Sequence, residues 1–289
     1  MQLGEVLQKT KTHFDKLGGD SSRLDAELLL SSALGWKRLD IYLKTDYPLS
    51  GEELEACREL VRRRSKGEPV AYILGEKDFF NVNLKVTPDV LIPRPETEHI
   101  VDEVIAHSKT LDMDRIRLLD LGTGSGCIAL ASAKEIETLE ATGLDISPKA
   151  VELAKINAKR NELSDRVSFL EQDVCALSME KNQFSEDRFD ILTANPPYIS
   201  EQDPEIAEDV KLFEPHIALF AEEDGLSFYR SWVRLCDVLL KPSGVCLFEI
   251  GHRQAKDVVE IFNASKLFQN VEVIKDYSHK DRVVKAIRK

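Results

Sequence analysis

Residues 116–126 read Ile-Arg-Leu-Leu-Asp-Leu-Gly-Thr-Gly-Ser-Gly, and this stretch decides the fold. Its first six residues form an apolar run with the length of a buried strand. Glycines follow at every second position, Gly122, Gly124 and Gly126, and a helical pattern starts at the last of them. A glycine-rich turn between a strand and a helix lets a ligand approach the backbone closely at the helix N-terminus. The stretch therefore predicts a ligand site on an α/β sheet.

The glycine spacing and the residue before it indicate which ligand this turn takes. A pyrophosphate-binding turn carries glycine at its first, third and sixth places, and here the sixth place is Cys127. Asp120, directly before the glycines, would repel a diphosphate and could instead face a cation. The order Asp-x-Gly-x-Gly-x-Gly resembles the first motif of the class I methyltransferases, whose cofactor, S-adenosylmethionine, carries an ammonium and a sulfonium.

Strand and helix patterns alternate after residue 116, which predicts a mainly parallel sheet with helices on both faces. Ser147 and Pro148 supply an N-cap and a first-turn proline for one of these helices, which runs to Asn161. The final two strands read as an antiparallel hairpin at a mixed edge. The expected fold is therefore α/β, a Rossmann-like seven-stranded mixed sheet, with strands at 116–121, 142–145, 166–171, 189–194, 244–250, 271–275 and 282–287.

Two aspartates follow the second and third expected strands. Asp145 lies 19 residues after Gly126, where an acid can accept both hydroxyls of a ribose. Such an acid serves NAD as well as adenosylmethionine and does not discriminate between them. Asp173 and Val174 fall where the methyltransferase fold contacts adenine. A single strand-end aspartate is as often a turn residue, but the glycine turn and both aspartates together predict a nucleotide-like cofactor.

Asn195-Pro196-Pro197-Tyr198 follows the fourth strand, at the carboxyl edge where open α/β sheets bind ligands. An ordinary proline turn is the plain alternative. The two prolines stiffen the backbone and remove two N–H donors, which leaves carbonyl acceptors, an amide and an aromatic face. An amide nitrogen is a poor nucleophile because its lone pair is delocalised, and acceptors around its N–H bonds can aim that lone pair at a methyl group. We predict that the Asn195 side-chain oxygen and the Pro196 carbonyl are these acceptors, with Tyr198 packing on the planar group.

Residues 1–77 contain only helical patterns and predict a separate domain. Asp20 or Ser21 can cap a second helix that ends at Gly35, and Ser50 can cap a third. That third helix ends in a basic cluster, Arg62-Arg63-Arg64-Lys66. The cluster is either a solvated turn that suits the helix dipole or a contact for an acidic or nucleic-acid-bearing partner.

Residues 78–94 change character and predict a β-hairpin that links the two domains. Alternating and β-branched residues indicate short strands, which we expect to turn around Thr87-Pro88-Asp89. The domain with the glycine turn then occupies residues 95–289. No Ser/His/Asp set and no cluster with metal-ligand spacing suggests a rival chemistry in it, so no metal is expected.

The net charge of −12 lies in one part of the 289-residue chain. Residues 1–94 hold 15 basic and 15 acidic side chains, whereas residues 95–289 hold 24 and 36. Because nucleic-acid binders are usually basic, this distribution disfavours a DNA or RNA substrate.

Five scattered cysteines without a CxxC pair indicate reduced thiols rather than disulfides or a zinc site. With no signal peptide and no apolar run of about 18 residues, we expect a cytoplasmic monomer that does not bind membranes.

Further motifs resemble one methyltransferase family, the HemK protein-(glutamine-N5) methyltransferases. From residue 68 onward the motifs occur in the family's order, and over residues 1–67 the resemblance is one of architecture only. The matching stretches are Glu68-Pro69-Val70-Ala71-Tyr72-Ile73-Leu74-Gly75 with Phe79, Leu91-Ile92-Pro93-Arg94-Pro95-Glu96-Thr97-Glu98, Asp120 to Leu130, Asn195 to Ile199, Glu214-Pro215, Asp224-Gly225-Leu226 with Phe228-Tyr229-Arg230, and Glu249-Ile250-Gly251.

The resemblance implies transfer of a methyl group from S-adenosylmethionine to the glutamine amide of the Gly-Gly-Gln motif in peptide chain release factors. That glutamine acts at the ribosomal peptidyl-transferase centre during termination. The helical domain is expected to help bind the release factor, and the sheet domain to receive its Gly-Gly-Gln loop. The implied glutamine contacts are Asn195, Pro196, Pro197 and Tyr198, with Arg94 and Glu96 as pocket wall or as a structural ion pair. The implied cofactor contacts are Asp120, Gly122, Thr123, Gly124, Ser125, Gly126, Asp145, Asp173, Val174 and Asn195.

Three other functions stay open at this point. A glutamine methyltransferase acting on a ribosomal protein would differ only in its N-terminal domain and loops. An adenine-N6 methyltransferase acting on nucleic acid would need a basic cleft, and a binding module without activity would not need the intact Asn195–Tyr198 motif. Two positions depart from the family pattern: Val174, where members often carry a larger residue, and 279–282, which lacks a glycine before Asp281-Arg282 and is assigned no role.

Overall fold

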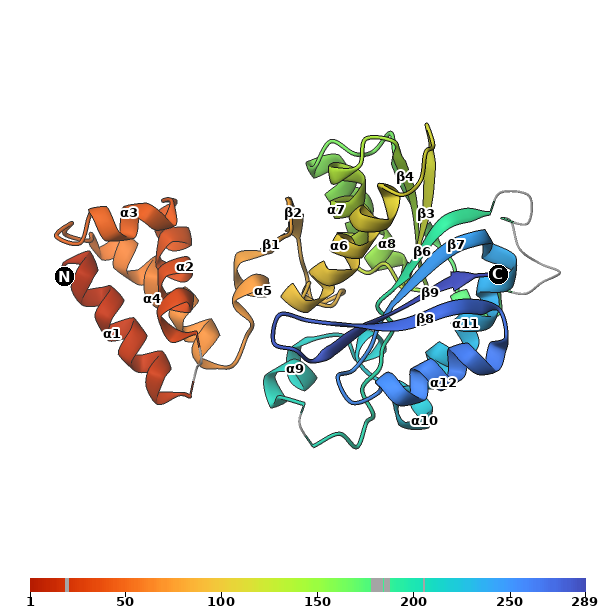
Figure 1. Cartoon of the computed structure of the whole chain (residues 1–289). Helices are drawn as coiled ribbons and strands as arrows, with labels where there is room; N and C mark the ends of the chain where they lie inside the picture. The colour runs from red at the N-terminus through yellow and green to blue at the C-terminus, as the bar shows by residue number, and fades with distance from the viewer. Residues whose placement is uncertain (19–20, 178–183, 185–187, 205) are drawn as a thin grey trace. The chain divides into compact units, whose positions relative to one another are not determined.

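The computed structural model describes residues 1–18, 21–177, 184, 188–204 and 206–289. Within it the chain divides into two compact units (Figure 1). The first contains residues 1–76 together with 208–213, and the second contains 77–207 together with 214–289. Asp20, one of the two cap residues suggested by the sequence, lies outside the described residues.

The first unit is built from helices around its own core. Ser50 begins the longest of them as expected, because its Oγ accepts from the Glu53 backbone N–H at 3.1 Å while Glu53 accepts from the Ser50 N–H at 2.8 Å. Gly35 ends the second helix in the left-handed conformation. The helices are α1 (Leu3–Lys16), α2 (Ser22–Leu34), α3 (Arg38–Leu43), α4 (Gly51–Ser65), α5 (Val70–Leu74) and α9 (Glu208–Phe213). The apolar core clusters of this unit contain the buried side chains of Leu3, Val6, Phe14, Ala26, Leu29, Leu30, Ile41, Leu49, Cys57 and Ile73.

The arginines at the end of α4 form ion pairs inside this unit. Arg64 Nε donates to Asp25 at 2.9 Å, and Arg63 pairs with Glu68. Arg62 pairs with a glutamate three residues earlier on the same helix. These pairs favour the structural interpretation of the basic cluster over a contact with a partner.

The hairpin forms, but its turn lies earlier than the sequence suggested. Strands β1 (Glu76–Phe79) and β2 (Val82–Lys85) make a two-stranded sheet that turns at Phe80, whose φ is 50°. The expected turn at Thr87-Pro88-Asp89 is therefore wrong as the hairpin turn. Those residues make a separate turn after β2, with the Val90 N–H donating to Thr87 O at 3.1 Å. Proline has no N–H for a strand ladder, so pairing ends before it.

The second unit contains one seven-stranded mixed sheet, as expected from the sequence. Its strand order is β5-β4-β3-β6-β7-β9-β8, with β9 antiparallel to both of its neighbours and the first five strands parallel. The strand order reverses between β4 and β6, on either side of β3, and such a switch point forms a ligand crevice at the carboxyl ends. The strands are β3 (Ile116–Leu121), β4 (Leu139–Asp145), β5 (Val167–Glu171), β6 (Phe189–Ala194), β7 (Leu240–Glu249), β8 (Phe268–Lys275) and β9 (Asp281–Arg288).

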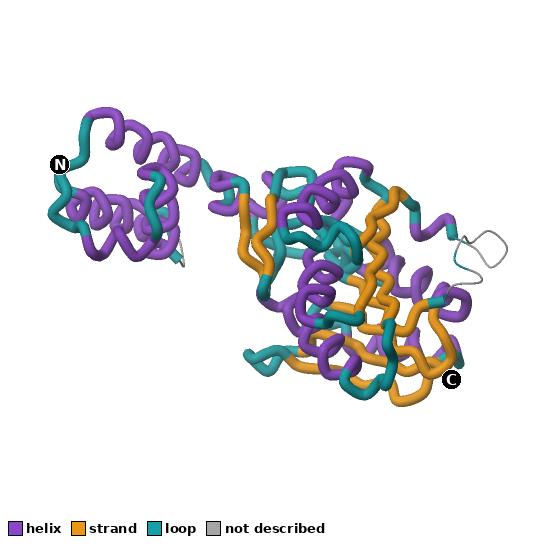
Figure 2. The backbone as a smooth tube through the Cα atoms, turned by 90° about the horizontal axis from the view of Figure 1, so that it is seen from above, coloured by secondary structure: helices purple, strands orange, loops and turns teal. Residues whose placement is uncertain are grey.

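Helices cover both faces of this sheet (Figure 2). One buried cluster joins the sheet to α6 (Glu98–Ser108), α7 (Cys127–Glu135) and α8 (Pro148–Arg160). A second cluster joins the opposite face to α11 (Ser227–Leu239) and α12 (Ala255–Ser265). The remaining elements are short: η1 (Pro95–Thr97), η2 (Val174–Ala176), η3 (His216–Ala218) and α10 (Glu222–Gly225).

One close contact inside the sheet involves a glycine. Gly143 of β4 lies opposite Phe169 of β5, and a Cβ added to Gly143 would lie 2.5 Å from the Phe169 ring. The ring also approaches Gly126 of the glycine turn, where an added Cβ would lie 2.8 Å from it. Phe169 thus fills space left by two glycines. Along the described chain, no helix is long and apolar enough to cross a membrane.

Candidate active site

The glycine turn connects the end of β3 to the start of α7 at the switch point of the sheet. Gly122, Gly124 and Gly126 have φ values of 67°, 54° and 82°, in the left-handed region that favours glycine. The Thr123 N–H donates to Leu144 O at 2.9 Å, which ties the turn to the end of β4. Gly122, Thr123, Gly124 and Ser125 line a pocket, whereas Gly126 lies behind it as the N-cap of α7.

Asp120 lies beneath the turn and is not among the residues that line the pocket. Its two carboxylate oxygens accept hydrogen bonds from the hydroxyls of Thr123 at 2.6 Å and Thr193 at 2.8 Å. Burial raises the pKa of Asp120 to about 6. The sequence suggested direct contact with a cation, and in the structure this side chain instead holds the turn in place from below.

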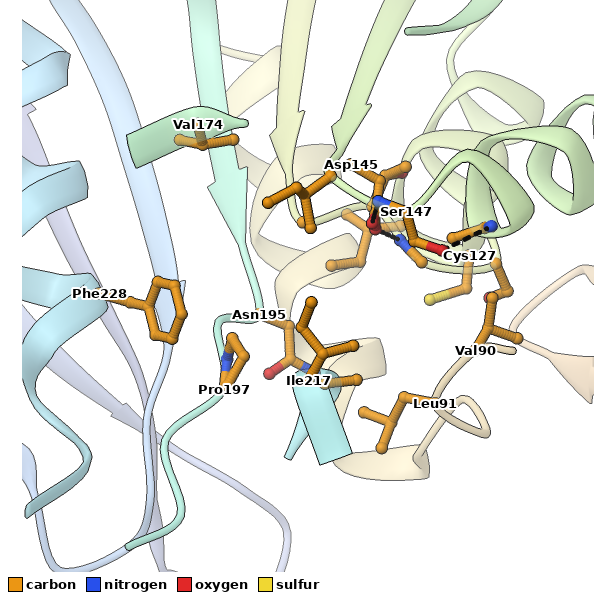
Figure 3. Close-up of a pocket in the computed structure, with 18 of the residues that line it drawn as sticks. Val90, Leu91, Cys127, Asp145, Ser147, Val174, Asn195, Pro197, Ile217 and Phe228 are labelled. Atoms are coloured by element: carbon orange, nitrogen blue, oxygen red, sulfur yellow. Dashed lines mark hydrogen bonds between the residues drawn. The ribbon is translucent and has the colours of Figure 1, made fainter. Parts of the chain in front are cut away.

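Asp145 ends β4 and points into the pocket beside the turn (Figure 3). Its Oδ2 accepts from the Gly124 N–H at 2.8 Å and its Oδ1 from the Ser147 N–H at 2.9 Å. Burial raises the pKa of Asp145. Each carboxylate oxygen can accept a second hydrogen bond, so the side chain is fixed in position and still able to receive two ligand hydroxyls.

The charges around the pocket favour a cationic ligand. Among the described residues that line it, the acids are Asp89, Asp145 and Asp173, and the base is Arg94. The charge of Arg94 is already balanced by an ion pair with Glu214, and that of Asp89 by an ion pair with Lys149 at 2.8 Å, so the excess negative charge of the lining comes from Asp145 and Asp173. Such a lining repels a diphosphate and attracts an ammonium or sulfonium.

Apolar side chains from several elements complete the pocket, and they suit a flat heterocycle. Asp173 accepts from the Cys175 N–H at 2.8 Å and thereby sets the start of η2. Val174, buried at 4 % exposure, contributes an apolar surface at one end of the pocket (Figure 3). The other large apolar side chains that line the pocket are Val90, Leu91, Ile128, Ile146, Ile217, Phe228 and Trp232.

Asn195 and Pro197 of the Asn195–Tyr198 turn line another wall of the same pocket, whereas Pro196 is buried and neither Pro196 nor Tyr198 is among the lining residues. Asn195 Nδ2 donates to Thr97 Oγ1 at 3.2 Å. Because this bond uses the amide nitrogen, Asn195 Oδ1 is left as the acceptor that faces a ligand. Figure 3 shows Asn195 and Pro197 adjacent to each other and across the pocket from Val90 and Leu91.

Tyr198 is held at the other end of this turn. Its Oη donates to Glu249 Oε1 at 3.3 Å, and its backbone carbonyl accepts from Gln254 Nε2 at 3.1 Å. Burial raises the pKa of the Tyr198 hydroxyl, so it stays protonated. Gly225, with φ of 85°, packs against the same carbonyl, and a Cβ there would lie 2.2 Å from Tyr198 O. Only glycine fits this close approach, which explains one of the family motifs.

Arg94 and Glu96 do not pair with each other. Arg94 lines the pocket and forms its ion pair with Glu214, whose Oε2 also accepts from the Ile92 N–H at 3.1 Å. Glu96 is exposed and does not line the pocket. The buried Glu214 thus joins two motifs that lie 120 residues apart in sequence.

Several residues of the site were not singled out individually from the sequence. Thr97 and Glu249 are both almost fully buried, and Glu214 and Gln254 support the same walls. The sequence could have pointed to Glu249 and Glu214, because each is an acidic residue within one of the family motifs. In the described part of the chain, no three His, Cys, Asp or Glu side chains gather as a metal site.

A glycine turn and a ribose-type acid at the switch point of such a sheet form a nucleotide-cofactor site, and the acidic lining together with the family match place the second unit among the class I methyltransferases. Residues 112–277 match the family described as "Methyltransferase domain", and residues 5–75 match "PrmC N-terminal domain". A methyltransferase structure from Pyrococcus furiosus shares this fold, with a TM-score of 0.51 and 16% identity over 78% of this chain and 96% of that one.

Full-length relatives specify the family further. The release factor glutamine methyltransferase of Geobacter sulfurreducens is 39% identical over 98% of this chain and 95% of its own. The release factor glutamine methyltransferase of Clostridium acetobutylicum is 34% identical over 100% of this chain and 99% of its own. The chain belongs to the release factor glutamine methyltransferase family, which confirms the resemblance found in its motifs.

Proposed function

We propose that this protein transfers a methyl group from S-adenosylmethionine to the side-chain amide nitrogen of the glutamine in the Gly-Gly-Gln motif of release factors. The observation that carries the proposal is the orientation of the Asn195 amide. Its nitrogen is used by Thr97 at 3.2 Å, so its oxygen is the atom available to a substrate N–H. A primary amide has two such N–H bonds and therefore suits a turn that offers acceptors.

The residues present fit the cofactor. The fixed carboxylate of Asp145 suits the ribose hydroxyls, and the apolar surface near Val174 suits adenine. The excess of aspartates suits the positive charge, and the pocket-lining backbone at Gly122 and Gly124 allows a close approach. When bound, S-adenosylmethionine supplies a methyl group on a positively charged sulfur that leaves as a neutral thioether.

The residues of the turn act on the nucleophile. Asn195 Oδ1 and the Pro196 carbonyl accept the two N–H bonds of the glutamine amide, which aims the nitrogen lone pair at the methyl carbon. Tyr198 packs on the planar amide and limits its rotation. The rate gain comes from positioning and from acceptors already in place as positive charge develops on nitrogen. No strong base is required, because the N–H becomes acidic once the nitrogen is methylated.

A methyl-transfer assay with labelled S-adenosylmethionine tests this function directly. We expect label from S-adenosylmethionine on purified release factor and none on its variant with Gly-Gly-Ala in place of Gly-Gly-Gln. Ribosomal protein and duplex DNA serve as the competing substrates. Label on the Ala variant as strong as on the parent, or label that favours DNA or ribosomal protein, would contradict the proposal.

A further inference from the structure

Two asparagines of α8, Asn157 and Asn161, hold the backbone of strand β2 in the same way. The Oδ1 of Asn157 accepts from the Lys85 N–H at 2.7 Å, and its Nδ2 donates to the Lys85 carbonyl at 3.0 Å. One helical turn later, Asn161 makes the same two bonds with Asn83, at 3.3 and 2.9 Å. Each side-chain amide thus pairs with β2 as the backbone of a neighbouring strand would, and α8 covers that edge of the hairpin.

The two asparagines differ in where their second N–H bond goes. In Asn161 it goes to the backbone carbonyl of Asn157, within α8 itself, at 2.9 Å. In Asn157 it goes to the backbone carbonyl of Ser125, in the glycine turn, also at 2.9 Å. Asn157 therefore joins β2 to the glycine turn, whereas Asn161 holds β2 alone.

The Asn157 side chain acts entirely through these backbone partners. It is 0 % exposed and does not line the pocket. A buried amide costs stability unless its polar atoms are paired, and here both N–H bonds donate and the oxygen accepts. Because hydrogen bonds depend on distance and angle, this amide fixes how the two backbone segments lie relative to each other.

The two joined segments lead into different walls of the cofactor pocket. Strand β2 ends at Lys85, and the pocket-lining residues Val90 and Leu91 follow shortly after it (Figure 3). Ser125 itself lines the pocket as part of the glycine turn. The spacing between these walls sets the space open to a ligand, and Asn157 is bonded to the backbone that supports each of them.

We propose that Asn157 is a positioning residue for the cofactor, which ties the glycine turn to β2 so that the two walls keep the spacing that S-adenosylmethionine needs. The turn is also held by groups close to it, such as Asp145, which accepts from the Gly124 N–H. Asn157 adds the bond from the side of the hairpin. The inference rests on the proposed cofactor for its effect on affinity and does not depend on the glutamine substrate.

Asn157→Ala and Asn161→Ala form a matched pair of variants. Each loses the same two bonds to β2, and each also loses a third bond, to the glycine turn in one case and within α8 in the other. Asn157→Asp is a second test of the bond to the turn. Its carboxylate keeps an oxygen for the Lys85 N–H but has no N–H to donate to Ser125.

Calorimetric titration with S-adenosylmethionine measures the consequence for the pocket. We expect Asn157→Ala and Asn157→Asp to raise the Kd about 10- to 100-fold, the loss typical of residues that orient metal-binding side chains from behind. Asn161→Ala should leave the Kd within about twofold of the wild type. Equal Kd values in Asn157→Ala and Asn161→Ala would overturn the proposal, because the bond to the turn would then contribute nothing.

Hydrogen exchange in the ligand-free protein tests the joint itself. The amides of β6 serve as the reference, since they report any general loss of stability. Relative to them, Asn157→Ala should speed exchange both in β2 and in the glycine turn, where the Gly124 and Gly126 N–H groups are hydrogen bonded. Asn161→Ala should speed it in β2 only. Unchanged exchange in either segment of a folded Asn157→Ala variant refutes the joint.

The two readouts also separate this inference from the proposed function. If the wild-type protein does not bind S-adenosylmethionine, the proposed cofactor fails, and hydrogen exchange still decides whether Asn157 joins the two segments. Should Asn157→Ala not fold, Asn157→Asp gives the decision, since it must weaken the Kd and speed exchange in the glycine turn.

Discussion

The two walls of the pocket are built in different ways. The wall at the glycine turn comes from residues close together in the chain, and much of it is held by backbone hydrogen bonds, such as those from Gly124 and Ser147 to Asp145. The wall at Asn195–Tyr198 is held by side chains that arrive from distant segments, Thr97 and Glu249 among them. The first wall is thus encoded locally, and the second depends on the whole sheet being assembled.

This difference separates binding from catalysis. A wall made of backbone groups and one acid suits tight, constant recognition of a cofactor. A wall whose residues are oriented by side-chain hydrogen bonds from distant segments suits a reaction in which orientation determines the rate. Changes in the first wall should therefore affect cofactor affinity, and changes in the second should affect turnover.

The largest effect is expected at Asn195. Asn195→Ala removes an acceptor that is needed only as charge develops in the transition state, so kcat should fall by about 10³-fold, while the Kd for S-adenosylmethionine changes by less than about threefold. Single-turnover kinetics with saturating cofactor and calorimetric binding measure the two quantities. A variant with normal turnover would refute the role given to this amide.

The next largest effect is the pH dependence of the free energy of unfolding. It compares two buried carboxyl groups, Glu249 behind one wall and Asp120 behind the other. Burial raises the pKa of Glu249 to about 7 and that of Asp120 to about 6. Since each raised pKa means that the folded state binds the proton more tightly, the free energy of unfolding falls as pH rises from the unfolded pKa to the folded one. For Glu249 this window runs from 4.5 to about 7, and its contribution is on the order of 3 kcal/mol.

Urea unfolding at a series of pH values measures this dependence. Glu249→Gln should flatten the slope between about pH 6 and 7, where the contribution of Asp120 is fading, and leave the Asp120 part at lower pH. The groups that influence the pKa of Glu249 are Tyr198, Arg282, Thr97 and Glu96. All four remain in this variant, so a change of slope reports the loss of the Glu249 carboxyl group. A slope equal to that of the wild type between pH 6 and 7 would show that Glu249 does not titrate there.

The smallest expected effect lies in the wall at the glycine turn. Asp145→Ala removes acceptors for two ligand hydroxyls and should weaken the Kd for S-adenosylmethionine by about 10- to 100-fold, equivalent to about 1.5–3 kcal/mol for hydrogen bonds to a charged group. At saturating cofactor, kcat should stay within about threefold. A large loss of kcat with unchanged Kd would reverse the assignment of binding to one wall and turnover to the other.

The sequence predicted the locally encoded parts well. The strands at 116–121 and 189–194 have the expected limits, because each is an apolar run with a clear end. Strand β7 begins at Leu240, before its expected start, since the Pro-Ser-Gly that reads as a loop lies inside an irregular strand. The hairpin turn was misplaced because Pro88 is a stronger turn signal than Phe80, although Phe80 adopts the left-handed conformation.

The substrate wall was only partly predictable. Asn195 and Tyr198 stand out in sequence because of the prolines between them. The partners that orient them, Thr97 and Glu249, carry no local pattern that reveals a pairing across 98 and 51 residues. Asp120 shows the converse, since its motif suggested ligand contact whereas the fold places its carboxylate beneath the turn, on two threonine hydroxyls.

The Phe169 ring, lodged against Gly143 and Gly126, has an evolutionary consequence. A methyl group added at Gly143 would lie 2.5 Å from that ring, so neither position can drift alone. A larger residue at 143 becomes acceptable only in a lineage that has already exchanged the phenylalanine for something smaller. The Phe169 ring also packs against Gly126 of the glycine turn. Replacing Phe169 by a smaller side chain would therefore remove packing from the turn as well as from the sheet. We therefore expect positions 143 and 169 to change together among relatives, whereas Gly126, with φ of 82°, should stay glycine in all of them.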